Sequence, residues 1–193
     1  MDAEPSCASR HETPPKSEVL VLDQHRAIAN VFVRVKSGLP DEEYPVPVQP
    51  VVLDQVGCRY VPHVFGVMRG QEVKILNSDG IMHNPHARSK VNPALNIAMP
   101  ANVAEATHRF SEPEWMFKIK CDVHSWMYAY VAVLTHPYFD TTDTDGTFSI
   151  PDLPAGTYEI EAWHEKLGTR VARVTLASGE RKSVDFTMGP YTR

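Results

Sequence analysis

The chain has 193 residues, of which 42% are hydrophobic and 22% are charged, so it can bury the core of one large domain or two small ones. Its formal net charge is −5, from 19 basic and 24 acidic residues, which argues against a nucleic-acid binder, because such proteins present a basic surface. No apolar run is long enough to span a bilayer, and three cysteines are too few for a disulfide framework, although one disulfide could form.

Residues 1–17 are predicted to be a flexible N-terminal tail, because they are polar, rich in proline and without periodicity. Cys7 in this tail is expected to be an exposed thiol. The first residues lack the apolar core of a signal peptide. Met1 before Asp-Ala-Glu-Pro is typical of a start codon placed before a mature N-terminus. We therefore expect a periplasmic or otherwise exported protein whose signal peptide has been removed.

The rest of the chain is dominated by short runs of β-branched and aromatic residues, several of which alternate between apolar and polar positions. No segment has the periodicity of a long amphipathic helix. The chain is therefore predicted to be all-β, with a larger domain at residues 18–137 and a small β-sandwich at residues 138–193. The expected strands lie within residues 19–22, 28–35, 51–53, 60–67, 72–76 and 117–134, and then 147–150, 158–163, 171–176 and 183–188.

A possible metal site lies within residues 117–134, which read as a strand, a tight loop and a second strand. Cys121, His124 and Met127 fall on this loop and supply a thiolate, an imidazole and a thioether. Two His and one Cys in a trigonal arrangement, with a distant axial Met, form the blue-copper site. The loop offers three of these four groups, so the second histidine must come from elsewhere in the chain.

The best candidate for that histidine is His83, which follows the predicted strand at residues 72–76. Here the sequence resembles the cupredoxins, and the resemblance covers residues 18–137. The matching positions are Tyr60-Val61-Pro62, Val67, Gly70, Val73, Asn77, His83 and Asn84, which are similar to a series found in plastocyanin-like proteins. The Cys-x-x-His-x-x-Met loop is similar to that of amicyanin. The resemblance implies a Greek-key β-barrel or sandwich.

The resemblance also implies the roles of individual residues. His83, Cys121 and His124 would be the strong ligands of one copper ion that cycles between Cu(I) and Cu(II), and Met127 would be the weak axial ligand. Asn84 would tie the two ligand loops together. The exposed ring edge of His124 would be the electron port, within an apolar rim that includes Trp126. The implied function is that of a type 1 (blue) copper protein. It would carry single electrons between a donor and an acceptor redox protein in the periplasm, without enzymatic turnover.

Cys58 leaves alternatives open, because the resemblance places it near the metal end of the barrel. It could be a spectator thiol, an additional ligand, or the partner of Cys121 in a disulfide that removes the copper ligand. The last case would make the protein a metal-free cell-surface binding or structural module. A copper carrier or a copper enzyme is a further alternative, with Cys58, His63 or His86 as added ligands. Zinc could use the same residues, but Met127 favours copper.

Residues 138–193 resemble the carboxypeptidase regulatory-like, transthyretin-like sandwich domains. The resemblance rests on residues 145–150, 153–160 and 184–186, which include Asp-Gly and Pro-x-Gly turns typical of chain reversals between short strands. No Ser-His-Asp set or pair of carboxylates stands out in this part of the chain. The resemblance implies a non-catalytic domain that acts in scaffolding or docking.

Overall fold

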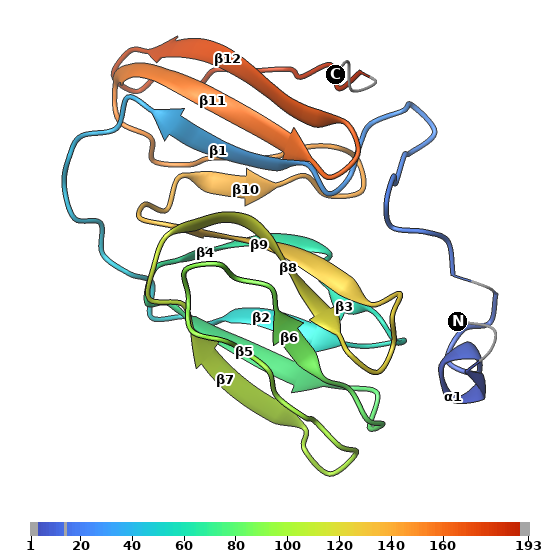
Figure 1. Cartoon of the computed structure of the whole chain (residues 1–193). Coiled ribbons are helices and arrows are strands. Elements are labelled where there is room, and N and C mark those ends of the chain that lie inside the picture. The colour runs from blue at the N-terminus through green and yellow to red at the C-terminus, as the bar shows by residue number, and fades with distance from the viewer. Residues whose placement is uncertain (1–3, 14, 190–193) are drawn as a thin grey trace. The chain divides into compact units, whose positions relative to one another are not determined.

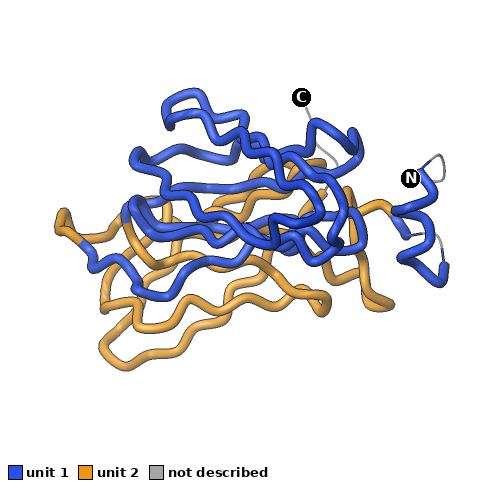
Figure 2. Tube along the Cα trace, turned by 90° about the horizontal axis from the view of Figure 1, so that it is seen from below, with its two compact units in different colours: residues 1–16, 44–135 blue, residues 17–43, 136–193 orange. Residues whose placement is uncertain are grey.

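A computed structural model describes residues 4–13 and 15–189. The chain forms two compact units, unit 1 from residues 1–16 and 44–135 and unit 2 from residues 17–43 and 136–193 (Figure 2). Apart from the short helix α1 (Pro5–Ala8), the regular elements of the described residues are strands (Figure 1), so the predicted all-β class is confirmed. No helix in these residues is long and apolar enough to cross a membrane.

Unit 1 is built from two four-stranded sheets that share one hydrophobic core. The first sheet has the order β3-β2-β5-β7 and the second the order β4-β9-β8-β6. Burial alternates along β5, so that Val73 and Ile75 reach the core, where they meet Ile119 and Val131 of the other sheet. The strands are β2 (Val51–Gln55), β3 (Tyr60–Val61), β4 (Val64–Met68), β5 (Glu72–Asn77), β6 (Pro85–Ala87), β7 (Glu105–Arg109), β8 (Glu114–Cys121) and β9 (Tyr128–Leu134).

Unit 2 has one four-stranded sheet in the order β10-β1-β11-β12 (Figure 1). Its strands are β1 (Phe32–Ser37), β10 (Phe139–Thr141), β11 (Gly156–His164) and β12 (Gly168–Leu176). The strands expected at residues 147–150 and 183–188 are absent from the structure. Their apolar residues, among them Phe148 and Phe186, instead pack on the core of the unit from irregular segments. The alternation of apolar and polar residues in these two segments therefore reflects burial of one face and does not indicate strand pairing.

The two units divide the chain differently from the expected domains at residues 1–17, 18–137 and 138–193. β1 pairs antiparallel with both β10 and β11, so residues 17–43 belong with the C-terminal unit. Residues 4–13 are also not a free tail, because they contain α1, and the side chain of Cys7 is fully buried in the core of unit 1. Of the predicted tail, residues 1–3 and 14 lie outside the described part.

Candidate metal centre

The loop between β8 and β9 brings three predicted ligands close together in the chain. Cys121 is the last residue of β8, and its backbone N–H donates to the carbonyl of Met127 over 3.0 Å. The N–H of Met127 donates in turn to the carbonyl of His124, also over 3.0 Å. These bonds close a tight turn in which the N–H of His124 points at the Cys121 sulfur, at 3.4 Å. Cys121, His124 and Met127 are all buried.

His83 reaches this loop from the segment between β5 and β6. It forms an isolated antiparallel bridge with Met99, and both of the backbone hydrogen bonds of that bridge are present. Two residues later, Pro85 pairs with Cys121 in the ladder between β6 and β8. Because adjacent strands lie about 4.8 Å apart, this pairing places His83 beside the end of β8.

The Nδ1 atoms of both histidines face the Cys121 sulfur. The two Nδ1 atoms are 3.1 Å apart, and the Sγ atom of Cys121 lies 4.0 Å from that of His83 and 3.8 Å from that of His124. Metal–nitrogen bonds of about 2.0–2.1 Å and a metal–thiolate bond of about 2.3 Å let one ion bridge donors at these separations. The donor set of two imidazoles and one thiolate suits copper or zinc. The residues present therefore fit such an ion.

The environment of Cys121 favours the thiolate, which is the form that binds metals. Burial alone would raise the pKa of this thiol. Hydrogen bonds from His83 and from the backbone N–H groups of His124, Asn84 and Val123 outweigh burial and lower the pKa. The same surroundings bury the phenol of Tyr60, and burial together with the nearby Cys121 and Asp122 charges raises the Tyr60 pKa.

Asp79 is a member of the site that the sequence analysis missed. Its Oδ2 atom lies 2.9 Å from Nε2 of His83, and its carboxylate also accepts hydrogen bonds from the N–H groups of Gly57, at 2.7 Å, and Cys58, at 2.8 Å. Arg10 forms an ion pair with it at 3.4 Å. Although burial opposes it, these partners lower the pKa of the carboxyl, with the hydrogen bond to His83 the largest of them. An Asp in an Asn-Ser-Asp-Gly turn looks like a turn residue, so its sequence carried no sign of this role.

Asp79 determines which nitrogen of His83 is left for a metal. When His83 is neutral, the carboxylate at Nε2 holds the single ring proton on that nitrogen and leaves the Nδ1 lone pair free for a metal; when His83 is protonated, Nδ1 donates to the Cys121 sulfur. Burial lowers the pKa of His83, but Asp79 and Cys121 raise it more, so that the net shift is upward. The pKa of His124 is lowered, by burial first and then by the neighbouring His83. The two imidazoles are therefore held in different electrostatic surroundings.

Asn84 does connect the two loops, but through its backbone. Its N–H points at the Cys121 sulfur, at 3.4 Å, and its carbonyl accepts from the N–H of Asp122, at 3.3 Å. Its side-chain amide instead donates to Asn96, at 2.9 Å. Met127 is 1% exposed and belongs to the same core cluster as Cys121, and its role as axial ligand stays a prediction.

Two of the suggested extra ligands are not gathered at the site. His86 on β6 points its Nδ1 atom at the carboxylate of Asp122, at 2.6 Å, on the partly exposed side of the sheet. His63 is buried beside the rings of Tyr128 and Tyr130. Neither histidine lies among the His, Cys and carboxylate groups that converge near Cys121.

All three alternatives for Cys58 (spectator thiol, additional ligand, or disulfide partner of Cys121) are wrong. Cys58 is bonded to Cys7, and Cys121 is a free, buried thiol. Cys7 precedes the residues covered by the cupredoxin resemblance and lies in a polar, proline-rich stretch, so its sequence indicated an exposed thiol in a loose tail and not a disulfide partner. The two bonded cysteines are 51 residues apart, and spacing alone does not fix a pairing.

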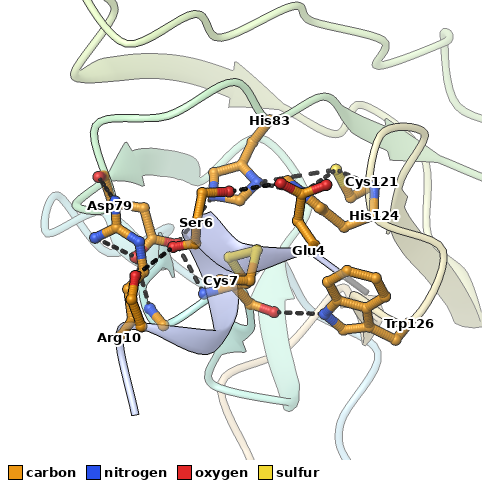
Figure 3. The surroundings of a disulfide bond; sticks show 12 residues. Glu4, Ser6, Cys7, Arg10, Asp79, His83, Cys121, His124 and Trp126 are labelled. Atoms are coloured by element: carbon orange, nitrogen blue, oxygen red, sulfur yellow. Dashed lines mark hydrogen bonds and ion pairs between the residues drawn. A yellow bond between two sulfur atoms is a disulfide. The ribbon is translucent and has the colours of Figure 1, made fainter. Parts of the chain in front are cut away.

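The ring edge of His124, expected at the surface, is also buried, with only 4% of the residue exposed. A ring nitrogen of His124 and the sulfurs of Cys7 and Cys58 lie within 4.8 Å of one another. Trp126 donates its indole N–H to the carbonyl of Cys58, at 3.1 Å, and its ring lies 5.2 Å from that of His124 (Figure 3). The N-terminal segment and the disulfide thus cover the position expected for the electron port.

Comparisons with known proteins agree with the two resemblances found in the sequence. The family model for the carboxypeptidase regulatory-like domain matches residues 127–189, which is under half of the chain. No curated protein sequence matches. Solved structures that are similar include the Cu-containing nitrite reductase from Thermus scotoductus SA-01, at 18% identity and a TM-score of 0.38. The similarity covers 50% of this chain, which spans only 25% of that enzyme.

Variants of amicyanin are also among the similar solved structures. A methionine-to-alanine variant in its Cu(I) form and an oxidised proline-to-glycine variant are similar over 52% of this chain and 97% of theirs. Their identities are 22% and 23%, and both TM-scores are 0.39. These matches say what the chain is similar to, and they say nothing of its activity.

Proposed function

We propose that unit 1 holds a type 1 (blue) copper centre that carries single electrons between a donor and an acceptor redox protein in the periplasm. His83 and His124 would bind the ion through Nδ1 and Cys121 through its thiolate, and Met127 would be the axial ligand. One copper ion would supply the Cu(I)/Cu(II) couple. The observation that carries the proposal is the convergence of two Nδ1 atoms and one sulfur, within 3.1 to 4.0 Å, on three buried residues.

The surroundings of these donors support electron transfer in place of substrate turnover. Each donor is fixed before any ion arrives, His83 by Asp79 and the loop of Cys121 and His124 by its own backbone hydrogen bonds. A site that cannot rearrange suits a metal that must change oxidation state without moving its ligands. The donors are also buried, with exposed fractions of 0% for His83, 1% for Cys121 and 4% for His124. This burial leaves little room for a substrate.

The alternatives from the sequence have lost support. A metal-free module with a Cys58–Cys121 disulfide conflicts with the pairing of Cys58 to Cys7. A copper carrier that uses Cys58 as an extra ligand needs a free thiolate there, which the disulfide removes. Cys121 keeps the free thiol that a copper–thiolate bond requires.

The test is a visible absorption spectrum of the oxidised protein after one equivalent of Cu(II) is added. An intense thiolate-to-copper band, with one copper bound per chain, is expected. The band should vanish in Cys121→Ser and persist in the double variant Cys7→Ser/Cys58→Ser, which serves as the matched control. A wild-type protein with a free Cys121 thiol that binds Cu(II) without this band would contradict the proposal.

A further inference from the structure

Residues 4–11, which we call the N-terminal cap, are fastened to unit 1 at three points beside the candidate metal centre. Cys7 is bonded to Cys58, Arg10 pairs with the carboxylate of Asp79 and donates to its carbonyl, and Nε2 of His11 lies 2.8 Å from the carbonyl of Gly57. A Cβ atom on Gly57 would lie 2.9 Å from the ring of His11. The absence of a side chain at residue 57 is thus what lets the cap lie close against the barrel.

The cap covers the side of the centre on which His124 lies. Cys7 is 0% exposed, and its sulfur packs in the same core cluster as Cys58, Cys121 and Met127. Figure 3 shows the disulfide with Arg10 and Asp79 on one side and Trp126 on the other. The nearest ring nitrogen of His124 lies within 4.8 Å of both sulfurs. The cap and its disulfide therefore stand between the imidazole and solvent.

We propose that the N-terminal cap occupies the docking surface for a redox partner, and that the Cys7–Cys58 disulfide is a latch which a dithiol opens. Both cysteines are 0% exposed, so the dithiol reaches a sulfur when the cap opens locally. The proposal rests on the proposed electron-transfer function, since it concerns access to the same centre. Two electrons and two protons convert the disulfide into the thiols of Cys7 and Cys58, and the reducing dithiol becomes a disulfide. With the covalent bond gone, the cap is held by non-covalent contacts, which are the polar contacts of Arg10 and His11 and the packing of the Cys7 side chain.

The contacts of the cap also indicate what the partner should present. Arg10 neutralises Asp79, whose side chain is 2% exposed, and a carboxylate that loses its cation in such a place is costly. Cys7 fills a small apolar position next to Trp126 and His124. A partner that replaces the cap should therefore offer an arginine or lysine beside a small apolar side chain. The exposed apolar residues Met82 and Val123, 42% and 48% exposed, would extend this surface.

The covered position of His124 distinguishes this proposal from a purely structural role for the disulfide. A disulfide that only stabilised the fold would restrict the unfolded chain, and its loss would lower stability without exposing one particular residue. Loss of a latch should expose His124 while the rest of unit 1 stays folded. His63 offers a matched internal control, because it is also 4% exposed and lies in unit 1, where it packs on Tyr128 and Tyr130.

The first test needs no metal. Hydrogen–deuterium exchange at the imidazole carbon of each histidine is measured by mass spectrometry in the metal-free full chain. Oxidised wild type is compared with dithiothreitol-reduced wild type and with Cys7→Ser/Cys58→Ser. We expect exchange at His124 to be about tenfold or more faster in the reduced protein and in the double serine variant. A buried group exchanges through local opening, and loss of the disulfide should raise the population of the open state by about that factor. Exchange at His63 should not change.

Two outcomes of this test would overturn the latch. One is exchange at His124 that is the same in all three samples. The other is an equal rise at His63, which would report general loosening of unit 1. Arg10→Gln keeps the disulfide and should leave His124 protected. A rise there as large as in the double serine variant would show that the ion pair, and not the disulfide, holds the cap closed.

The second test uses the copper-loaded protein and hexaammineruthenium(II), a small cationic reductant. Opening of the cap uncovers both the His124 edge and the Asp79 carboxylate, which attracts a cation. Reduction of the bound Cu(II) should therefore be about tenfold faster in Cys7→Ser/Cys58→Ser than in wild type, the same factor as expected for exchange at His124. Equal rates, together with a blue copper band in both proteins, would refute the docking surface. If no blue band forms at all, the proposed function fails, while the metal-free exchange result still decides whether the latch exists.

Discussion

Replacing Asp79 with asparagine should separate the geometry of the candidate metal centre from its electrostatics. The side chains have the same shape, but the amide offers one acceptor oxygen and one NH2 donor. The carboxylate oxygens now accept from Nε2 of His83 and from the N–H groups of Gly57 and Cys58. Whichever way the amide turns, its NH2 group faces at least one of these donors. If the NH2 group faces His83, Nε2 must accept its hydrogen bond, and the proton of the neutral imidazole then lies on Nδ1, which is the proposed metal-binding atom.

The expected loss can be stated for both metal affinity and stability. Mutating a group that orients a metal-binding histidine typically costs about 10–100-fold in affinity, which is about 1.4–2.8 kcal/mol. In the metal-free protein, loss of charge-assisted hydrogen bonds at a buried carboxylate should lower the free energy of unfolding by about 2–4 kcal/mol. The loss of affinity arises at one atom pair, Oδ2 of Asp79 and Nε2 of His83, which are 2.9 Å apart, whereas the loss of stability also includes the bonds from Gly57 and Cys58.

Two measurements check this prediction. Cu(I) affinity is determined by competition with a coloured chelator, and the tautomer of His83 is read from its ring nitrogen chemical shifts in the metal-free protein. Asp122→Asn is the matched control, since it removes a carboxylate that contacts His86 outside the converging donors. A folded Asp79→Asn protein that keeps its proton on Nε2 of His83, and whose affinity falls no more than that of the control, would refute the reasoning.

Other predictions follow from single side chains. Met127→Ala should keep a copper–thiolate band but shift its position, and an unchanged spectrum would argue against an axial role. His136 should titrate near pH 4 by NMR, because burial and then the Arg34 charge lower its pKa to about 4, so that unit 2 loses stability as the pH falls from about 6.5 towards 4. A titration above pH 6 would contradict this. Ile75→Ala should lower the free energy of unfolding by about 2–5 kcal/mol in urea melts, since Ile75 is fully buried in unit 1. Metal-free wild type should lose stability as the pH falls from about 4, where Asp79 of the unfolded chain takes up a proton, through the lowered pKa of Asp79 in the folded state, and Asp79→Asn should show less of this loss.

The sequence predicted those parts of the candidate metal centre whose residues are close together along the chain. The spacing of Cys121, His124 and Met127 placed three groups on one loop, and the loop has the backbone hydrogen bonds that a tight turn needs. His83 was found through a resemblance, because nothing in its local sequence reveals the bridge to Met99 that brings it to Cys121. Contacts within a loop can be inferred from spacing, whereas contacts between loops need the register of the sheet.

What the sequence did not reveal concerns contacts between distant segments. The partner of Cys58 lies 51 residues away, in a stretch whose polar composition is typical of a mobile tail. Asp79 looks like a turn residue until the fold places His83 and the N–H groups of residues 57 and 58 around it. The sequence of β1 predicts a strand without stating its partner, so residues 17–43 were assigned to the wrong side of the boundary.

The position of β1 between β10 and β11 has a consequence for how this protein is made and dissected. Residues 44–135 are effectively inserted into the chain of unit 2, so β1 leaves the ribosome long before either strand that it must pair with. Unit 2 therefore completes its sheet only late in synthesis, after most of unit 1 is available to fold. A gene fragment ended at residue 137 would carry β1 with both edges unpaired, and a fragment of residues 138–193 would lack a central strand. Separate expression of unit 2 calls for a chain without residues 44–135, in which a linker joins residues 17–43 to residues 136–193.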